Sequence, residues 1–158
     1  MPTQETIWKP HVTVASVIEH DGSYLLVEET INGRQVLNQP AGHLEPGETL
    51  IDAVIRETLE ETGWDFLPEY LINVYRLNLQ EKGRTYLRFN FTGQAVKFNP
   101  DQELDTGIDR ALWLSYDDIA NAGSRHRSPL VMQSILDFTA GIRHPLSLLQ
   151  DIDSISGD

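Results

Sequence analysis

The sequence of 158 residues predicts one α/β or α+β domain, arranged as an α/β/α sandwich on a mixed β-sheet. Alternating segments rich in β-branched residues lie on both sides of one central helical segment, and a second helical segment lies near the C-terminus. No internal repeat, linker or compositional boundary divides the chain, so residues 1–158 are expected to form a single domain. We expect an ordered core from about residue 9 to residue 145 and a frayed tail over residues 150–158.

The individual elements follow from periodicity and turn signals. The turn signals are His20-Asp21-Gly22-Ser23, which predicts a hairpin, Asn32-Gly33, and Glu81-Lys82-Gly83. Extended structure is predicted over residues 11–19, 24–29, 36–42, 67–79, 86–98 and 111–114. Beyond the central helix, short helical structure is predicted over residues 116–122, and a helix begins at Ser128-Pro129 and ends near Ala140.

The central helix has clear ends and two contrasting faces. Thr49, followed by Asp52, is typical of an N-cap with an acidic third position, and Gly63 is a stop signal. Apolar residues recur every four positions and predict a stripe that faces the core: Ile51, Ile55 and Leu59. The opposite face carries three carboxylates at spacings of i, i+3 and i+4, on Glu57, Glu60 and Glu61. Like charges stacked in this way favour a bound hard cation such as Mg²⁺ or Mn²⁺.

Composition limits the partners of the chain. With 24 acidic and 12 basic residues its net charge is −12, which disfavours long nucleic acid and anionic membranes as partners. A small anionic substrate bound through a metal fits this charge better. The chain has no cysteine, which excludes disulfides and thiolate metal sites. The N-terminus lacks the apolar core of a signal peptide, so a cytoplasmic location is the default expectation.

The acidic helix is part of a longer pattern, G-x5-E-x7-R-E-x-x-E-E-x-G, formed by Gly42, Glu48, Arg56, Glu57, Glu60, Glu61 and Gly63. This pattern resembles the Nudix box, the signature of a family of hydrolases. The resemblance implies the Nudix fold and a divalent metal, Mg²⁺ or alternatively Mn²⁺, held by Glu57, Glu60, Glu61 and the carbonyl of Gly42. Thr58 and Trp64 depart from the pattern, which has bulky aliphatic residues at these two packing positions.

The flanking segments resemble those of the bacterial NudJ-type phosphatases within this family. The segments are HVTVA, VEETING, NQPAGHLE, LRF and RSPLV, and the resemblance runs from about residue 9 to residue 145. It implies release of terminal phosphate from nucleoside tri- and diphosphates, thiamine diphosphate and hydroxymethylpyrimidine diphosphate. Leu37 stands where such proteins tend to carry Trp, so a ring contact with the substrate would differ here.

The same resemblance implies roles for further residues. Glu57, Glu60 and Arg56 form the catalytic group, in which Arg56 pairs with a box glutamate. Glu48 supports Arg56 or binds a second metal through water. Glu60 is the candidate general base within the box. A carboxylate from the loop before Trp113 is the alternative, with three candidates that could equally be solubilising charge: Glu103, Asp105 and Asp109.

Phosphate groups also need cations other than the metal. Arg88 alternates with the apolar residues of its strand, and Arg127 precedes a helix start, so both are candidate substrate contacts; surface salt bridges are the alternative. Asn38 and Gln39 could hydrogen-bond a substrate ring or cap a turn.

Two other functions stay open at this point. One is cleavage of an internal pyrophosphate bond, as in Nudix enzymes that act on ADP-ribose or release pyrophosphate from triphosphates. The other is a binding or regulatory module that has lost catalysis, which the intact set of box carboxylates disfavours. A monomer and a homodimer are both compatible with the sequence.

Overall fold

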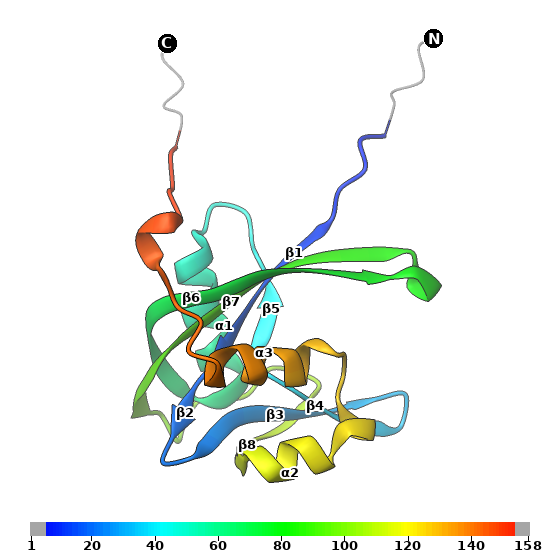
Figure 1. The fold of residues 1–158 in the computed structure, drawn as a ribbon, viewed down its shortest axis with the longest axis vertical. Coiled ribbons are helices and arrows are strands. Elements are labelled where there is room, and N and C mark those ends of the chain that lie inside the picture. The colour runs from blue at the N-terminus through cyan, green and yellow to red at the C-terminus, as the bar shows by residue number, and fades with distance from the viewer. Residues whose placement is uncertain (1–5, 154–158) are drawn as a thin grey trace.

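A computed structural model of the chain describes residues 6–153 (Figure 1). The predicted looseness of residues 1–5 and fraying of residues 154–158 fall outside the described residues. Residues 6–10 and 150–153 have no helical or strand structure. The ordered structure extends slightly past the predicted end of the core, through a short 3₁₀ helix at Leu146–Leu148. Among residues 6–153, no helix is long and apolar enough to span a membrane.

The strands form two sheets. The first has the order β5-β1-β7-β6-β9, and is mixed because β1 runs parallel to β7 while the other pairs are antiparallel. Its strands are β5 (Ala41–His43), β1 (His11–Val17), β7 (Arg84–Phe98), β6 (Trp64–Leu79) and β9 (His144–Pro145). In the second, β3 pairs antiparallel with all three of its partners. Its strands are β2 (Glu19–His20), β3 (Ser23–Ile31), β4 (Arg34–Asn38) and β8 (Ile108–Ser115).

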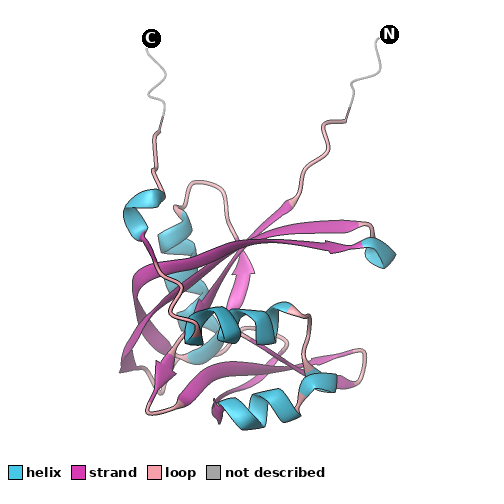
Figure 2. Ribbon diagram, viewed as in Figure 1, coloured by secondary structure: helices cyan, strands magenta, loops and turns pink. Residues whose placement is uncertain are grey.

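Three α-helices complete the sandwich: α1 (Leu50–Thr62), α2 (Tyr116–Asn121) and α3 (Leu130–Thr139). Figure 2 shows α3 between the long strands of the first sheet and the strands of the second. The helices α1 and α3 lie on opposite faces of the first sheet, and each helix contributes to a separate apolar cluster. Ala53 and Val54 of α1 pack with Val14 and Phe91, whereas Val131 and Ile135 of α3 pack with residues that include Val17, Leu26 and Ile72. The predicted fold class is confirmed.

The first predicted hairpin is correct in its turn but not in its partner. Asp21 and Gly22 have φ values of 48° and 79°, which suits the tight turn of a two-residue hairpin. Only β2, at Glu19–His20, pairs with β3 across this turn. The preceding strand β1 lies in the other sheet, between β5 and β7. The predicted single strand over residues 11–19 is therefore two strands in different sheets: β1 ends at Val17, and β2 begins at Glu19.

The ends of α1 are as predicted, but its faces are only partly so. The Thr49 side chain accepts a hydrogen bond from the Asp52 N–H, and Gly63 has a φ of 77°. The predicted core stripe is only partly correct: Ile51, Ile55 and Leu59 are all half-buried, and Ile51 packs against the first apolar cluster. The buried residues of α1 are Ala53, Val54, Glu57, Thr58, Glu61 and Thr62. Two box glutamates are thus enclosed, since β5 and the loop between β7 and β8 cover the face that carries them.

The two departures from the Nudix pattern both have local partners. Thr58 is fully buried; it donates a hydrogen bond to the Val54 carbonyl at 2.7 Å and contacts the Ser16 hydroxyl at 2.9 Å. Ser16 is also fully buried, so the Thr58 hydroxyl provides the acceptor that Ser16 needs. Trp64 is half-buried, and its ring packs against Phe98 and Trp113.

This pairing makes Thr58→Val destabilising, although valine is the aliphatic residue that the pattern favours. The Ser16 hydroxyl would then lose its acceptor inside the core, at a cost of about 1–2 kcal/mol in the free energy of unfolding. Urea denaturation measures this cost. The double variant Ser16→Ala/Thr58→Val should be more stable than Thr58→Val alone, because it removes the stranded hydroxyl. A double variant that loses the sum of two independent costs would contradict the pairing.

Candidate active site

Arg56 connects the carboxylates at the face of α1. Its guanidinium donates to both oxygens of Glu48, from Nε at 3.0 Å and from Nη2 at 2.7 Å. Nη1 donates to Glu57 at 2.8 Å and to Glu60 at 3.1 Å. These hydrogen bonds shift both partners against the effect of burial: Arg56 lowers the pKa of Glu48, and Glu48 and Glu57 raise the pKa of Arg56. One cation therefore reduces the repulsion among three carboxylates, and the contacts expected of Arg56 and Glu48 are present.

Gly42 allows the backbone of β5 to lie against Glu57. A Cβ atom at Gly42 would lie 2.0 Å from the carboxyl carbon of Glu57 and 2.1 Å from its Oε1. The glycine is required here for close approach rather than for an unusual φ. Glu57 is only 8% exposed, and burial raises its pKa although the hydrogen bond from Arg56 opposes the change.

Glu61 lies deeper than the other two box glutamates. Its Oε1 accepts a hydrogen bond from the Ala41 N–H at 2.6 Å. Burial raises the pKa of Glu61 to about 8 even though this hydrogen bond favours the carboxylate. Without a nearby cation, the Glu61 side chain is therefore largely protonated at neutral pH.

Asp105 joins the box glutamates from the loop between β7 and β8. Its N–H donates to the Glu60 carbonyl at 2.9 Å, which anchors the loop to α1. One carboxylate oxygen from each of Glu57, Glu60 and Asp105 lies within 4.8 Å of the others. Of the other two loop candidates, Glu103 is exposed, and Asp109 accepts a hydrogen bond from Thr30 at 2.6 Å. Only Asp105, among the three loop candidates, belongs to this cluster.

The donor set fits a hard divalent cation. The cluster offers only oxygen atoms, which Mg²⁺ and Mn²⁺ prefer, and the lack of a Cβ atom at Gly42 lets the backbone of β5 lie against Glu57. The set differs in one member from the expected ligands. Asp105 occupies the third position of the cluster, while Glu61 is directed at the Ala41 N–H.

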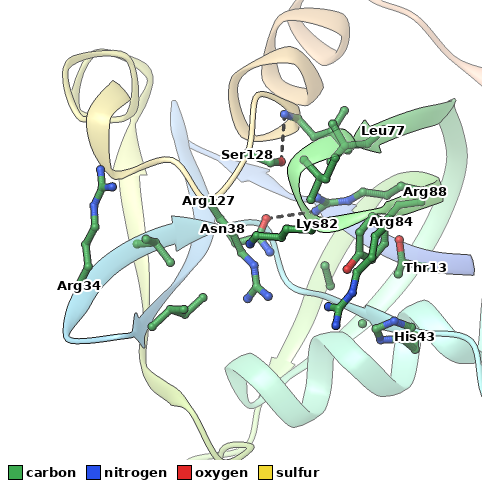
Figure 3. Close-up of a pocket in the computed structure, with 17 residues that line it drawn as sticks. Thr13, Arg34, Asn38, His43, Leu77, Lys82, Arg84, Arg88, Arg127 and Ser128 are labelled. Carbon is green, nitrogen blue, oxygen red and sulfur yellow. Dashed lines mark hydrogen bonds between the residues drawn. The ribbon is translucent and has the colours of Figure 1, made fainter. Parts of the chain in front are cut away.

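A cavity of about 400 Å³ opens beside this cluster, between β4, α3 and the hairpin formed by β6 and β7 (Figure 3). Ala41 and Gly42 line its inner end, so the cavity and the carboxylate cluster share β5 as a wall. Its apolar lining comes from Ile31, Val36, Leu77, Leu79 and Leu130, together with the ring of Tyr86.

The charge of this lining is opposite to that of the chain. Five of the chain's 12 basic residues line the cavity, and none of the acidic residues within 6–153 does. The five are Arg34, Lys82, Arg84, Arg88 and Arg127. An acidic helix and a basic cavity thus adjoin, as a polyphosphate bound to a metal would require.

Arg88 is a buried cation with few partners. It is 6% exposed, and its Nη2 donates one long hydrogen bond, at 3.3 Å, to Asn38 (Figure 3). Its Nε has no hydrogen-bond partner within residues 6–153. Burial lowers the pKa of Arg88 to about 10, so the side chain is still protonated at neutral pH. A buried guanidinium without a carboxylate partner is costly unless an anion binds it.

The other predicted substrate contacts differ in accessibility. Arg127 lines the cavity and forms an ion pair with Glu29 at 2.6 Å, so the surface salt bridge considered as its alternative does exist. Asn38 lines the cavity. Gln39, between β4 and β5, is 1% exposed and donates to the Val131 carbonyl of α3 at 2.8 Å, and it is not part of the cavity lining.

Leu37, which stands where NudJ-type proteins tend to carry Trp, lies on the side of β4 that faces the core. Leu37 is 1% exposed and packs in the apolar cluster beneath α2 and α3. Its neighbours Val36 and Asn38 line the cavity, whereas Leu37 does not. Leu37 itself therefore does not line this cavity, because alternate residues of β4 face opposite sides.

Lys82 and Arg84 were not predicted as cavity residues from the sequence. They lie in a turn and at the start of β7, and the local sequence there does not show which residues pack nearby. Arg84 and Arg88 are four positions apart on β7, which places them on the same face of the sheet. This spacing was the one available indication. His43 lies at the same cavity, and burial, followed by the charges of His11, Arg127 and Arg84, lowers its pKa.

Glu61 makes the stability of the metal-free protein depend on pH. Its pKa is 4.5 in the unfolded chain and about 8 in the fold, so the folded state binds more protons between these values. The stabilising contribution is complete below about pH 4.5 and is lost as the pH rises through about 8. In EDTA, the melting temperature should fall between pH 5 and pH 8 by on the order of 5 °C more than in Glu61→Gln. Equal pH profiles would show that Glu61 is not buried as a neutral acid.

A NUDIX domain model matches residues 8–133, which covers most of the chain. Phosphatase NudJ of Escherichia coli strain K12 is 44% identical over 147 residues, covering 93% of this chain and 95% of that protein. The same values hold for Phosphatase NudJ of Shigella flexneri.

Solved structures agree with the family match. A NUDIX hydrolase from Nitrosomonas europaea is 58% identical, with a TM-score of 0.89, and the match covers 91% of this chain and 98% of that one. A UDP-X diphosphatase is 20% identical with a TM-score of 0.71 over 91% of this chain and 70% of that one, a likeness that shows the fold alone. With the box residues and the fold both in place, the chain belongs to the Nudix family and is a hydrolase of phosphoric anhydrides that resembles the NudJ phosphatases.

Proposed function

We propose that the protein uses Mg²⁺ to release inorganic phosphate from the ends of nucleoside tri- and diphosphates and related pyrophosphate esters, including hydroxymethylpyrimidine diphosphate and thiamine diphosphate. One observation supports this proposal above the others. A carboxylate cluster suited to a hard cation adjoins a cavity lined by five basic and no acidic residues. The likeness to Phosphatase NudJ, at 44% identity over nearly the whole chain, supports the choice of terminal phosphate.

Residues Glu57, Glu60 and Asp105 would hold the metal, with the Gly42 carbonyl and a deprotonated Glu61 available beside them. When bound, a divalent cation of this kind neutralises phosphate oxygens and activates water for attack on phosphorus. Arg56 would keep the carboxylates in place between turnovers, since it already bridges Glu48, Glu57 and Glu60.

Proton removal from the attacking water requires a carboxylate close to the metal ligands. Glu60 meets this requirement from within the box, and Asp105 meets it from the loop. Glu103 and Asp109 are weaker candidates, since neither belongs to the cluster and Asp109 is bound to Thr30. Of the three loop carboxylates we therefore retain Asp105 as the alternative base.

The remainder of the substrate would occupy the cavity. Arg88 and Arg127 would bind phosphate oxygens, and Asn38 orients Arg88 through its Oδ1 atom. The apolar side chains of β6, β4 and α3 would contact a base or pyrimidine ring, for which a cavity of about 400 Å³ is large enough.

The direct test is phosphate release from GTP, GDP, thiamine diphosphate and hydroxymethylpyrimidine diphosphate, with and without Mg²⁺. Phosphate that appears from the diphosphates without an added phosphatase is the expected result. Signal only after addition of pyrophosphatase or phosphatase would indicate cleavage of an internal bond, and the terminal-phosphate proposal would fall.

The same assay tests the metal site. Glu60→Gln and Glu61→Gln each keep the side-chain shape and remove the charge, so each should lower kcat/KM by at least roughly tenfold. Glu103→Gln is the matched control, because Glu103 lies in the same loop as Asp105 and is exposed like it, but does not belong to the cluster. Full activity in both box variants would refute the assignment of these carboxylates.

A further inference from the structure

The hairpin formed by β6 and β7 reaches beyond the body of the first sheet (Figure 1). Its tip contains the 3₁₀ turn Gln80–Lys82 and the start of β7 at Arg84. Four residues of the tip line the cavity: Leu77, Leu79, Lys82 and Arg84. The tip is therefore one wall of the cavity, opposite the wall that β4 and Arg127 provide.

The two cations of this wall are free to bind an anion. Lys82 and Arg84 are exposed, and neither forms a side-chain hydrogen bond or an ion pair with any other described residue. Arg127, by contrast, is paired with Glu29.

The register of β7 sets the positions of these cations relative to the carboxylate cluster. Thr13 of β1 pairs with Arg88 on one side and with His43 of β5 on the other. Arg88 is thus in the row that adjoins Gly42, and Arg84 is four residues further toward the tip on the same face, at roughly 13 Å along the strand. Figure 3 shows the guanidinium groups of Arg84 and Arg127 directed toward the same end of the cavity, where His43 and α1 lie.

Hydrolysis at a terminal phosphate leaves the other phosphates on the organic product. The oxygen of water forms a bond to the terminal phosphorus, the bond from that phosphorus to the bridging oxygen breaks, and the bridging oxygen stays with the product. The water protons pass to the base and to the released phosphate. The metal cluster serves the terminal phosphate, so the retained phosphates need other cations.

We propose that Lys82 and Arg84 are specificity-determining residues that bind the retained phosphates and favour triphosphates over diphosphates. The proposal rests on the proposed function above. A triphosphate retains two phosphates and a diphosphate retains one, and the hairpin tip offers two unpaired cations. Because both side chains would contact phosphates that keep their bonds during the reaction, they bind substrate and transition state to a similar extent, and their effect falls on KM rather than on kcat.

The experiment compares Lys82→Gln/Arg84→Gln with Arg76→Gln. Arg76 is exposed on the same hairpin, but it pairs with Leu87 and lies on the opposite face from the cavity. In the double variant we expect the KM for GTP to rise roughly tenfold and the KM for GDP to rise by less, with kcat within about threefold of the parent. Arg76→Gln should leave both KM values unchanged. Equal KM values in the double variant and the control, or equal rises for GTP and GDP, would overturn the proposal.

A binding measurement separates this proposal from the proposed function. The dissociation constant of guanosine 5′-[β,γ-imido]triphosphate with Mg²⁺, measured by calorimetry, needs no phosphate release. Weaker binding in the double variant than in Arg76→Gln supports the hairpin contacts even if the phosphate-release assay fails. Unchanged binding, together with normal phosphate release, overturns the hairpin contacts and leaves the proposed function intact.

Discussion

The bond network of Arg56 is the interaction on which the site depends. Four carboxylates lie within 4 Å of its guanidinium, on Glu45, Glu48, Glu57 and Glu60. Without that cation the carboxylates of one helical turn would repel one another, and α1 could not lie with Glu57 buried against β5. The network also joins α1 to the preceding loop, because Arg56 donates to the His43 carbonyl at 3.1 Å. Two carboxylates of the cluster, on Glu57 and Glu60, and the backbone at His43 are therefore held by one side chain.

The site combines two regions of opposite charge that share β5. The chain as a whole has a net charge of −12 and repels anions at long range. The cavity reverses this locally, since its lining is basic and free of carboxylates. An acidic cluster beside a basic cavity suits an anionic substrate that is bound partly through a metal cation and partly by basic side chains. It also disfavours extended polyanions, which would meet the acidic remainder of the surface.

Buried polar groups beneath α3 form a third feature, which adjoins the cavity. Asn90 donates to Ser134 at 2.5 Å, and Asn73 donates to Asp137 at 2.9 Å, so α3 is attached to the sheet by hydrogen bonds as well as by apolar packing. Within residues 6–153, the buried side-chain atoms without a partner are Gln39 Oε1, Arg88 Nε and Asn90 Oδ1. Such atoms lower stability, and of the three residues Arg88 lines the cavity, where an unpaired donor is typical of a region that serves binding rather than stability.

Local sequence signals determined much of the fold. Cap residues fixed the ends of α1, Gly-containing turns fixed the hairpins at Asp21-Gly22 and Asn32-Gly33, and alternation predicted β6 and β7 within a few residues. These features depend on neighbours in the chain, so a sequence contains the information. The box carboxylates were also visible, because helical spacing places Glu57, Glu60 and Glu61 at known angles to one another.

Only the tertiary structure determined which face of α1 is buried and which residues surround the site. The stripe of Ile51, Ile55 and Leu59 is only half-buried because β5 and a distant loop enclose the glutamate side of α1 instead. The selection of Asp105 over Glu103 and Asp109 depends on a backbone hydrogen bond to Glu60 across 45 positions of the chain. Long-range contacts also determine that Leu37 faces the core and that Lys82 and Arg84 face the cavity. Contacts between residues far apart in sequence are set by strand register and sheet order, and no local pattern encodes them.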